Sequence, residues 1–104
     1  MKVSMLVLTA AMLAAGAAQA DDGKALLQKS GCTACHSEDK KLVGPAYKDV
    51  AVKYKGDAAA PAKLAEKVKK GGSGVWGPVP MPPNANVKDE DIKVMVAYVL
   101  ALKK

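Results

Sequence analysis

Five apolar residues near the C-terminus of the chain fall on one face of a predicted helix. They are Ile92, Met95, Val96, Val99 and Leu100. Their spacing of i, i+3, i+4, i+7 and i+8 predicts an amphipathic helix over residues 88–103. Acidic residues at 89–91 and lysines at 103 and 104 suit the two ends of its dipole.

Three shorter helices are predicted upstream, over residues 21–30, 47–55 and 61–70. Their apolar positions are Ala25, Leu26 and Leu27 in the first, Val50 and Tyr54 in the second, and Leu64 and Val68 in the third. Glycines at 31 and at 71–72 end the first and third helices. No segment alternates apolar and polar residues as a strand would. The pattern therefore predicts an all-α fold.

Residues 71–86 interrupt this helical pattern with four glycines and four prolines. Neither a helix nor a central strand tolerates such a composition. Long irregular loops are uncommon in small domains and often functional. Trp76, Val79 and Met81 indicate that this loop packs against something.

The first twenty residues have the layout of a secretory signal peptide. Lys2 precedes an apolar run, and Ala18-Gln19-Ala20 forms a small-x-small cleavage site. The apolar run is shorter than the roughly 20 residues that a membrane span needs. We therefore expect a cleaved leader over residues 1–20, one domain over residues 21–104 and no membrane span in the mature protein.

The charge of the chain favours protein partners over nucleic acid. The formal net charge is +6, every basic residue is lysine, and aromatic residues make up 4% of the sequence. Nucleic-acid-binding proteins usually supply arginine forks and exposed aromatic rings. A lysine-rich exported protein is better suited to docking on acidic protein surfaces, an attraction that salt weakens.

Composition also suggests that the core is incomplete without a cofactor. The chain has no Phe and one Trp, so few large side chains are available for burial. Domains of this size often need a disulfide, a metal or a cofactor for stability. A disulfide between Cys32 and Cys35 would close only a very short loop and would constrain the unfolded chain little.

The segment Cys32-Thr33-Ala34-Cys35-His36 is the motif that attaches haem covalently. Each thiol can bond one vinyl group of the porphyrin, and His36 can then bind the iron. Zinc is disfavoured because a structural site needs about four ligands. Thiol–disulfide exchange is the stronger rival, but that motif normally accompanies a βαβ unit, and the chain shows no strand pattern.

A second iron ligand is available in the proline-rich loop. Met81 lies between Pro80 and Pro82, whose rings restrict the backbone and would hold a sulfur at a fixed point. Met95 lies on the apolar stripe and is expected to pack in the core. Ligation by His36 and Met81 would leave no open coordination site and would raise the reduction potential. That arrangement favours one-electron transfer over catalysis.

The chain resembles the class I cytochromes c, in particular the short soluble bacterial type. The matching segments are residues 31–36, 43–50 and 74–84, which read GCTACH, VGPAYKDV and GVWGPVPMPPN. The resemblance implies about four short helices around one covalently attached haem c. It also implies that the Pro45 carbonyl accepts a hydrogen bond from His36, that Trp76 donates to a haem propionate and that Asn84 bonds near the Met81 sulfur. Relatives often have Arg where Lys67 stands. Two alternatives therefore stay open for Lys67: a contact with a haem propionate, or a side chain that is simply solvated.

The expected function is that of a monomeric periplasmic electron carrier, not an enzyme. Its expected partners are larger redox proteins with acidic docking patches: a quinol-oxidising complex, a nitrite reductase, a terminal oxidase or a peroxidase. Four lysines near the motif, Lys29, Lys40, Lys41 and Lys48, are expected to help ring the exposed haem edge. The alternative is a haem-based sensor or a small peroxidase-like enzyme in which Met81 does not bind the iron.

Overall fold

The computed structural model describes residues 22–103. In this range the chain forms an N-terminal helix over residues 22–29, the short 3₁₀ helix η1 (Cys32–Ala34), and helices α2 (Tyr47–Lys53), α3 (Ala60–Lys70) and α4 (Asp89–Ala101). The described residues contain two isolated β-bridges and no strand. The predicted all-α architecture with four α-helices is confirmed. The expected leader over residues 1–20 lies outside the described residues.

The helix ends differ from the predicted ones by a few residues. Helix α2 ends at Lys53, two residues earlier than predicted, and α4 ends at Ala101. Lys103 therefore lies beyond the last turn of α4, which contains no basic residue, while Lys104 is outside the described residues. The acidic first turn of α4 and the basic last turn of α3 are both present, as predicted.

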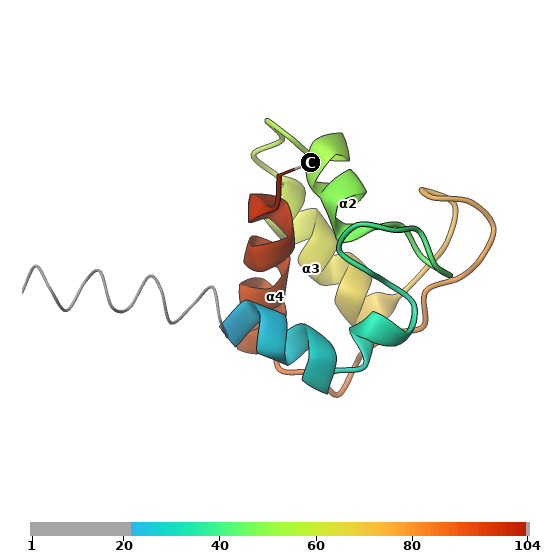
Figure 1. The fold of residues 1–104 in the computed structure, drawn as a ribbon. Coiled ribbons are helices and arrows are strands. Elements are labelled where there is room, and N and C mark those ends of the chain that lie inside the picture. Colours follow the sequence, from blue (N-terminus) through green and yellow to red (C-terminus); the bar gives the residue numbers. More distant parts are fainter. Residues whose placement is uncertain (1–21, 104) are drawn as a thin grey trace, which may run out of the picture.

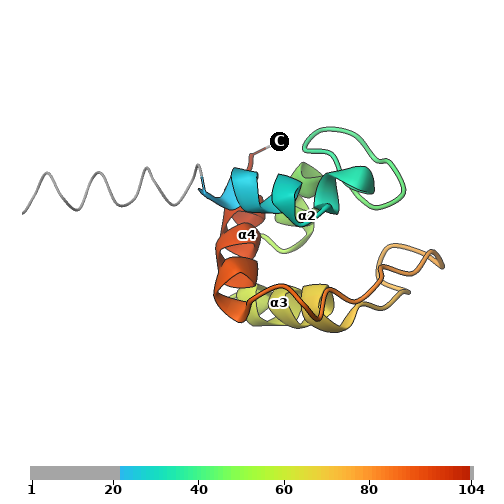
Figure 2. The same cartoon turned by 90° about the horizontal axis from the view of Figure 1, so that it is seen from below.

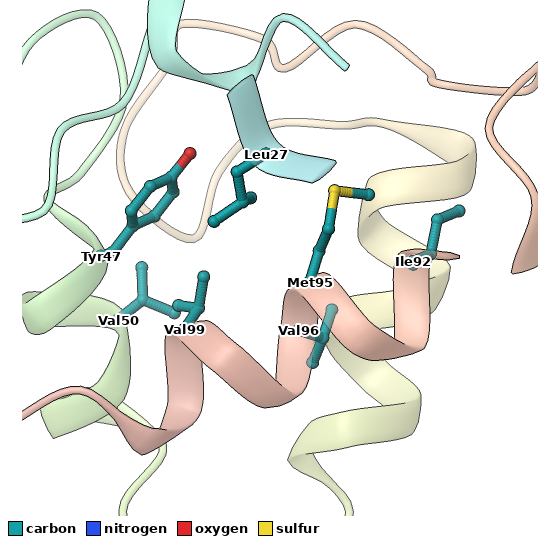
Figure 3. Close-up of a cluster of buried hydrophobic side chains, with 7 residues drawn as sticks. All are labelled: Leu27, Tyr47, Val50, Ile92, Met95, Val96 and Val99. Atoms are coloured by element: carbon teal, nitrogen blue, oxygen red, sulfur yellow. The ribbon is translucent and has the colours of Figure 1, made fainter. Parts of the chain in front are cut away.

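Helix α4 supplies most of the hydrophobic core (Figure 3). The core side chains are Leu27, Tyr47, Val50, Ile92, Met95, Val96 and Val99. The predicted apolar stripe is confirmed, because four of its five residues are buried and Leu100 packs against them. Ala25 is exposed, so only Leu26 and Leu27 turn towards the core. Among the described residues Ile92 is the only large side chain less than 2% exposed, which leaves the core small.

The N-terminal helix, α2 and α3 are arranged around α4 (Figures 1 and 2). Helix α4 packs against both α2 and α3. The N-terminal helix crosses α4 closely at Gly23, where a Cβ atom would lie 2.5 Å from Cβ of Tyr98. Figure 2 shows η1 and the following loop on one side and α3 with the proline-rich loop on the other. The fold thus holds two irregular segments apart and facing each other.

The sequence predicts no membrane span in the mature protein, and residues 22–103 can be searched for one in the structure. No helix there has the length and the apolar character needed to cross a bilayer.

Candidate cofactor site

A cleft of about 560 Å³ lies between the Cys32–His36 turn and the proline-rich loop. This volume is within the range of about 300–1,000 Å³ that is usual for cofactor sites. Its walls include all four residues proposed to hold or bind a haem: Cys32, Cys35, His36 and Met81. Buried or half-buried side chains of three helices line its floor, among them Val50, Leu64, Val68, Met95 and Val99.

The two cysteines are presented by a tight turn directly after the N-terminal helix. Gly31 ends that helix with a φ of 78°, a left-handed conformation that other residues rarely adopt. Helix η1 follows, and the amide of Cys35 donates to the carbonyl of Cys32 at 3.2 Å. A 3₁₀ turn has about three residues, so positions 32 and 35 lie on the same side of it. Both cysteines are free in the structure, and burial raises the pKa of the Cys32 thiol.

His36 is oriented by the backbone of the loop that follows it. Its Nδ1 atom donates a hydrogen bond to the Pro45 carbonyl oxygen at 2.7 Å. A carbonyl oxygen only accepts hydrogen bonds, so Nδ1 carries a proton, and in the neutral imidazole Nε2 is the nitrogen with the free lone pair. Such a bond is the usual means of orienting a metal-binding imidazole. In the neutral ring, Nε2 is therefore the nitrogen suited to bind iron.

Two neighbours restrict the His36 ring further. The Tyr47 ring stacks on it, with centroids 5.3 Å apart and planes inclined by 24°. A Cβ atom added to Gly44 would overlap the ring, lying 2.9 Å from Nδ1 and closer still to Cε1. Position 44 therefore needs a glycine because any larger residue would overlap the imidazole.

The Tyr47 hydroxyl is buried without a hydrogen-bond partner. Burial raises the pKa of Tyr47 far above its usual value, with smaller contributions from Cys32, Glu38 and Tyr98. A buried hydroxyl without a partner costs free energy, about 1–3 kcal/mol. The Tyr47 ring thus contributes packing against His36, while its hydroxyl contributes nothing favourable in this structure.

Met81 is held opposite by backbone pairing at the base of its loop. Gly72 and Met81 exchange two hydrogen bonds, of 3.0 and 2.8 Å, that form an isolated antiparallel bridge. Gly71 precedes this bridge with a φ of 73°, and a Cβ atom on it would lie 2.5 Å from the Met81 carbonyl oxygen. Glycine is therefore needed at position 71 both for its dihedral angle and for the close approach of the two backbones.

Asn84 fastens the other end of the same loop to α3. Its backbone amide donates to the Val68 carbonyl oxygen at 3.0 Å, and its side-chain amide donates to the same oxygen at 3.1 Å and to that of Pro82 at 3.2 Å. Val68 lies in the last turn of α3, where carbonyl groups lack partners within the helix. Asn84 therefore steadies the loop, while its contact with the Met81 sulfur stays a prediction.

Trp76 and Lys67 both line the cleft. Trp76 is 43% exposed, and the Lys53 ammonium lies 5.6 Å from its ring centroid, within cation–π range. The Lys67 side chain reaches over Gly72, where a Cβ atom would lie 2.8 Å from Nζ. Both positions are compatible with contacts to anionic groups at the cleft edge, and both contacts stay predictions.

The donor set of the cleft fits a haem. It combines two thiols on one turn, an imidazole with a free Nε2 and a thioether on the facing loop, around largely apolar walls. A flat apolar porphyrin would fill the space that the small core leaves open. His36 and the two cysteines lie on one side and Met81 on the other, so the structure brings together the four residues that the sequence pointed to.

Three features of the site were not evident from the sequence. The stacking of Tyr47 on His36, the demand for glycine at position 44 and the Gly72–Met81 bridge all depend on tertiary contacts. Tyr47 was visible only as the start of a helix. The pair of glycines after α3 was visible only as a helix stop. No local spacing distinguishes these roles.

Comparison with known proteins identifies relatives along nearly the whole described chain. The family model described as Cytochrome c matches residues 20–103. Cytochrome c-551 of Allochromatium vinosum is 59% identical over 92 residues, which cover 88% of this chain and 96% of that protein. Cytochrome c-551 of Pseudomonas aeruginosa is 51% identical and covers 94% of this chain, with 92% of its own length matched. The crystal structure of Nitrosomonas europaea cytochrome c552 superposes with a TM-score of 0.74 at 50% identity, covering 77% of this chain and 99% of that one.

Proposed function

Because the chain belongs to the cytochrome c family, we propose that its Cys32 and Cys35 attach the haem and that His36 and Met81 bind the iron from opposite faces. The protein is a small mono-haem electron carrier with covalently bound haem c. When bound, the haem supplies an iron that gains or loses one electron. The residues of the chain attach it, orient its ligands and exclude water from it.

One observation carries the ligand assignment. The His36 Nδ1–Pro45 hydrogen bond leaves Nε2 as the iron-binding atom, on a cleft that Met81 lines from the facing loop. Two protein ligands would leave no position for a substrate, so the iron would exchange electrons only. This arrangement supports a carrier without enzymatic activity. Membership of the cytochrome c family further supports hydrogen-bonding roles around the cofactor for Pro45, Trp76 and Asn84.

Absorption spectra of purified holoproteins test the assignment. The oxidised protein should show the weak red-edge band of iron–sulfur ligation, which disappears on reduction, and the reduced protein should not bind carbon monoxide. Met81→Ala should lose the band and gain carbon monoxide binding. Met95→Leu is the matched control, because Met95 is 2% exposed in the core and should leave the band intact. A wild type that lacks the band and binds carbon monoxide would favour the sensor or peroxidase-like alternative.

The mouth of the cleft is the proposed docking surface for redox partners. Its lips carry five apolar side chains that are 43–60% exposed, here called the apolar collar: Leu42, Val43, Val75, Trp76 and Val79. Lys41 lines the cleft beside the collar, and Lys53 lies over the Trp76 ring. Electrons would pass here because this is where the cofactor comes nearest to solvent. The acidic partners are proposed to be a quinol-oxidising complex, a nitrite reductase, a terminal oxidase or a peroxidase. This protein is proposed to bind each of them as a monomer.

The four lysines expected around the haem edge are not equivalent. Lys48 forms a close ion pair with Asp39, which raises its pKa and offsets its charge. Lys41 lines the cleft, while Lys29 and Lys40 are exposed. Replacing Lys41 by Gln should therefore slow electron transfer to an acidic partner more than Lys48→Gln, with a weaker salt dependence. Equal effects of both substitutions would contradict docking at the cleft mouth.

We also propose that the chain is exported to the periplasm and cleaved after Ala20. The family match begins at residue 20, and covalent haem would be attached to the domain over residues 21–104. The intact mass of the exported holoprotein tests the boundary. It should equal the chain from Asp21 plus one haem, with no thiol left for alkylation.

A further inference from the structure

Glu38 receives contacts from two elements that are distant in sequence. The Tyr98 hydroxyl on α4 donates to Oε2 of Glu38 at 3.0 Å. The Lys24 ammonium on the N-terminal helix lies 4.0 Å from the same oxygen. Glu38 follows His36 by two residues, so these contacts join the segment after His36 to two helices.

Backbone hydrogen bonds also fix the position of Glu38. The amides of Tyr47 and Lys48, at the start of α2, donate to the carbonyls of Ser37 and Glu38 at 2.9 and 3.1 Å. Tyr98 emerges where the N-terminal helix crosses α4, because Gly23 lets the two backbones approach closely there. The carboxylate therefore sits at a junction of three helices and not on a free loop.

Glu38 also shares a cavity with His36. The lining of a second hollow, of about 400 Å³, includes Lys24, His36, Glu38, Tyr47 and Tyr98. Burial raises the pKa of Tyr98, and its hydrogen bond to Glu38 and the charge of that carboxylate raise it further. Because Glu38 and His36 line the same hollow, the carboxylate lies close to the surroundings of that imidazole.

We propose that Glu38 is a positioning residue that lowers the reduction potential of the iron and, through Tyr98, fixes the segment after His36 against α4. A negative charge near the iron favours its oxidised, more positive state. Lys24 opposes this effect, but its side chain is 60% exposed against 34% for Glu38, so solvent screens its charge more. This inference rests on the proposed binding of iron by His36.

Potentiometry of four holoproteins tests the charge. Glu38→Gln keeps an acceptor for Tyr98 and removes the charge, so the potential should shift to more positive values. Lys24→Gln should shift it to more negative values, and by less. Glu66→Gln is the matched control, because Glu66 undergoes the same chemical change on α3, is 65% exposed and pairs with Lys70. Its shift should be the smallest of the three.

Hydrogen exchange of the reduced holoprotein tests the tether. Tyr98→Phe removes the hydrogen bond and keeps the carboxylate, so amides over residues 36–45 should exchange roughly three- to tenfold faster. Amides in α3 report global stability and should change by less. Unchanged exchange over residues 36–45 would overturn the tether.

The two proposals fail in different ways. If the wild type shows the iron–sulfur band but Glu38→Gln shifts the potential no more than Glu66→Gln, the role of Glu38 is wrong and the ligand assignment stands. If the wild type lacks the band and His36→Ala leaves its spectrum unchanged, the ligand assignment is wrong and the role of Glu38 falls with it.

Discussion

Gly71 and Met81 approach so closely that a Cβ atom on the glycine would lie 2.5 Å from the Met81 carbonyl oxygen. The contact lies next to the bridge between Gly72 and Met81, which closes the proline-rich loop. The sulfur-bearing residue is therefore placed by backbone contacts at the base of its loop. Prolines on either side of Met81 then limit how far it can move.

Gly71→Ala should destabilise the protein and displace Met81. Gly71 has φ 73° and ψ −164°, a conformation that costs a residue with Cβ about 1–3 kcal/mol, and a forced backbone contact adds about 1–3 kcal/mol. The unfolding free energy should fall by about 2–6 kcal/mol, and the iron–sulfur band should weaken. Chemical unfolding and absorption spectra measure both.

Gly56→Ala provides the control for that experiment. Gly56 has a similar φ of 81°, and no atom lies within 4 Å of its hypothetical Cβ. This substitution should cost only the dihedral strain, about 1–2 kcal/mol, and should leave the band unchanged. Equal losses at positions 56 and 71 would show that the contact with Met81 is unimportant.

Gly44→Ala should disturb His36 directly. The new methyl group would overlap an imidazole that is held by Pro45 and packed against Tyr47. We expect a loss of about 1–3 kcal/mol in unfolding free energy and a spectrum indicating weakened iron–imidazole bonding. Gly56→Ala again serves as the control, because its φ is positive and no atom lies within 4 Å of its hypothetical Cβ. It should lower stability without altering the spectrum.

Tyr47→Phe should make the holoprotein less sensitive to alkali. An unfolded tyrosine loses its proton near pH 10, whereas burial raises the pKa of Tyr47 in the folded protein. Above about pH 10 the unfolded chain thus binds fewer protons than the folded one, so wild-type stability falls as pH rises. Chemical unfolding at about pH 9, 10 and 11 should show a shallower fall for Tyr47→Phe.

The same variant tests the unpaired hydroxyl near neutral pH. Its removal should leave the unfolding free energy unchanged or raise it by up to about 1–3 kcal/mol. Tyr98→Phe removes a hydroxyl that is bonded to Glu38 and should lower it. A clear loss for Tyr47→Phe, with pH curves parallel to wild type, would mean that this hydroxyl has a partner in the holoprotein.

Asn84→Ala should loosen the Met81 loop from α3. It removes the side-chain bonds to the carbonyls of Val68 and Pro82 and keeps the backbone bond. The unfolding free energy should fall by about 1–2 kcal/mol, and carbon monoxide should bind the reduced protein more readily. The exposed Asn86 supplies the control, since Asn86→Ala should change neither quantity. Identical behaviour of the two variants would contradict a role for Asn84 in holding the loop.

The sequence by itself determined the helical class and the chemistry of the site. The i, i+3, i+4 stripe of α4 needs only local geometry to show which face is buried, and Ile92, Met95, Val96 and Val99 are indeed buried. Cys32, Cys35 and His36 lie within five residues of sequence, so their shared role in binding a haem can be predicted without knowledge of the fold. Met81 was distinguished from Met95 because prolines exclude a helical core position.

Only the tertiary structure decided how these residues are held. Tyr47 stacks on His36, Tyr98 reaches Glu38 across 60 positions of sequence, and Gly71 lies against Met81. Ala25 was wrongly predicted to face the core, because the path of the neighbouring helix is set by packing. Lys103 was wrongly placed in the last turn of α4, because packing also determines where that helix ends. The local sequence pattern determines which side chains a segment contains and which face of a helix is apolar. The position and orientation of those side chains depend on contacts between segments that are distant in sequence.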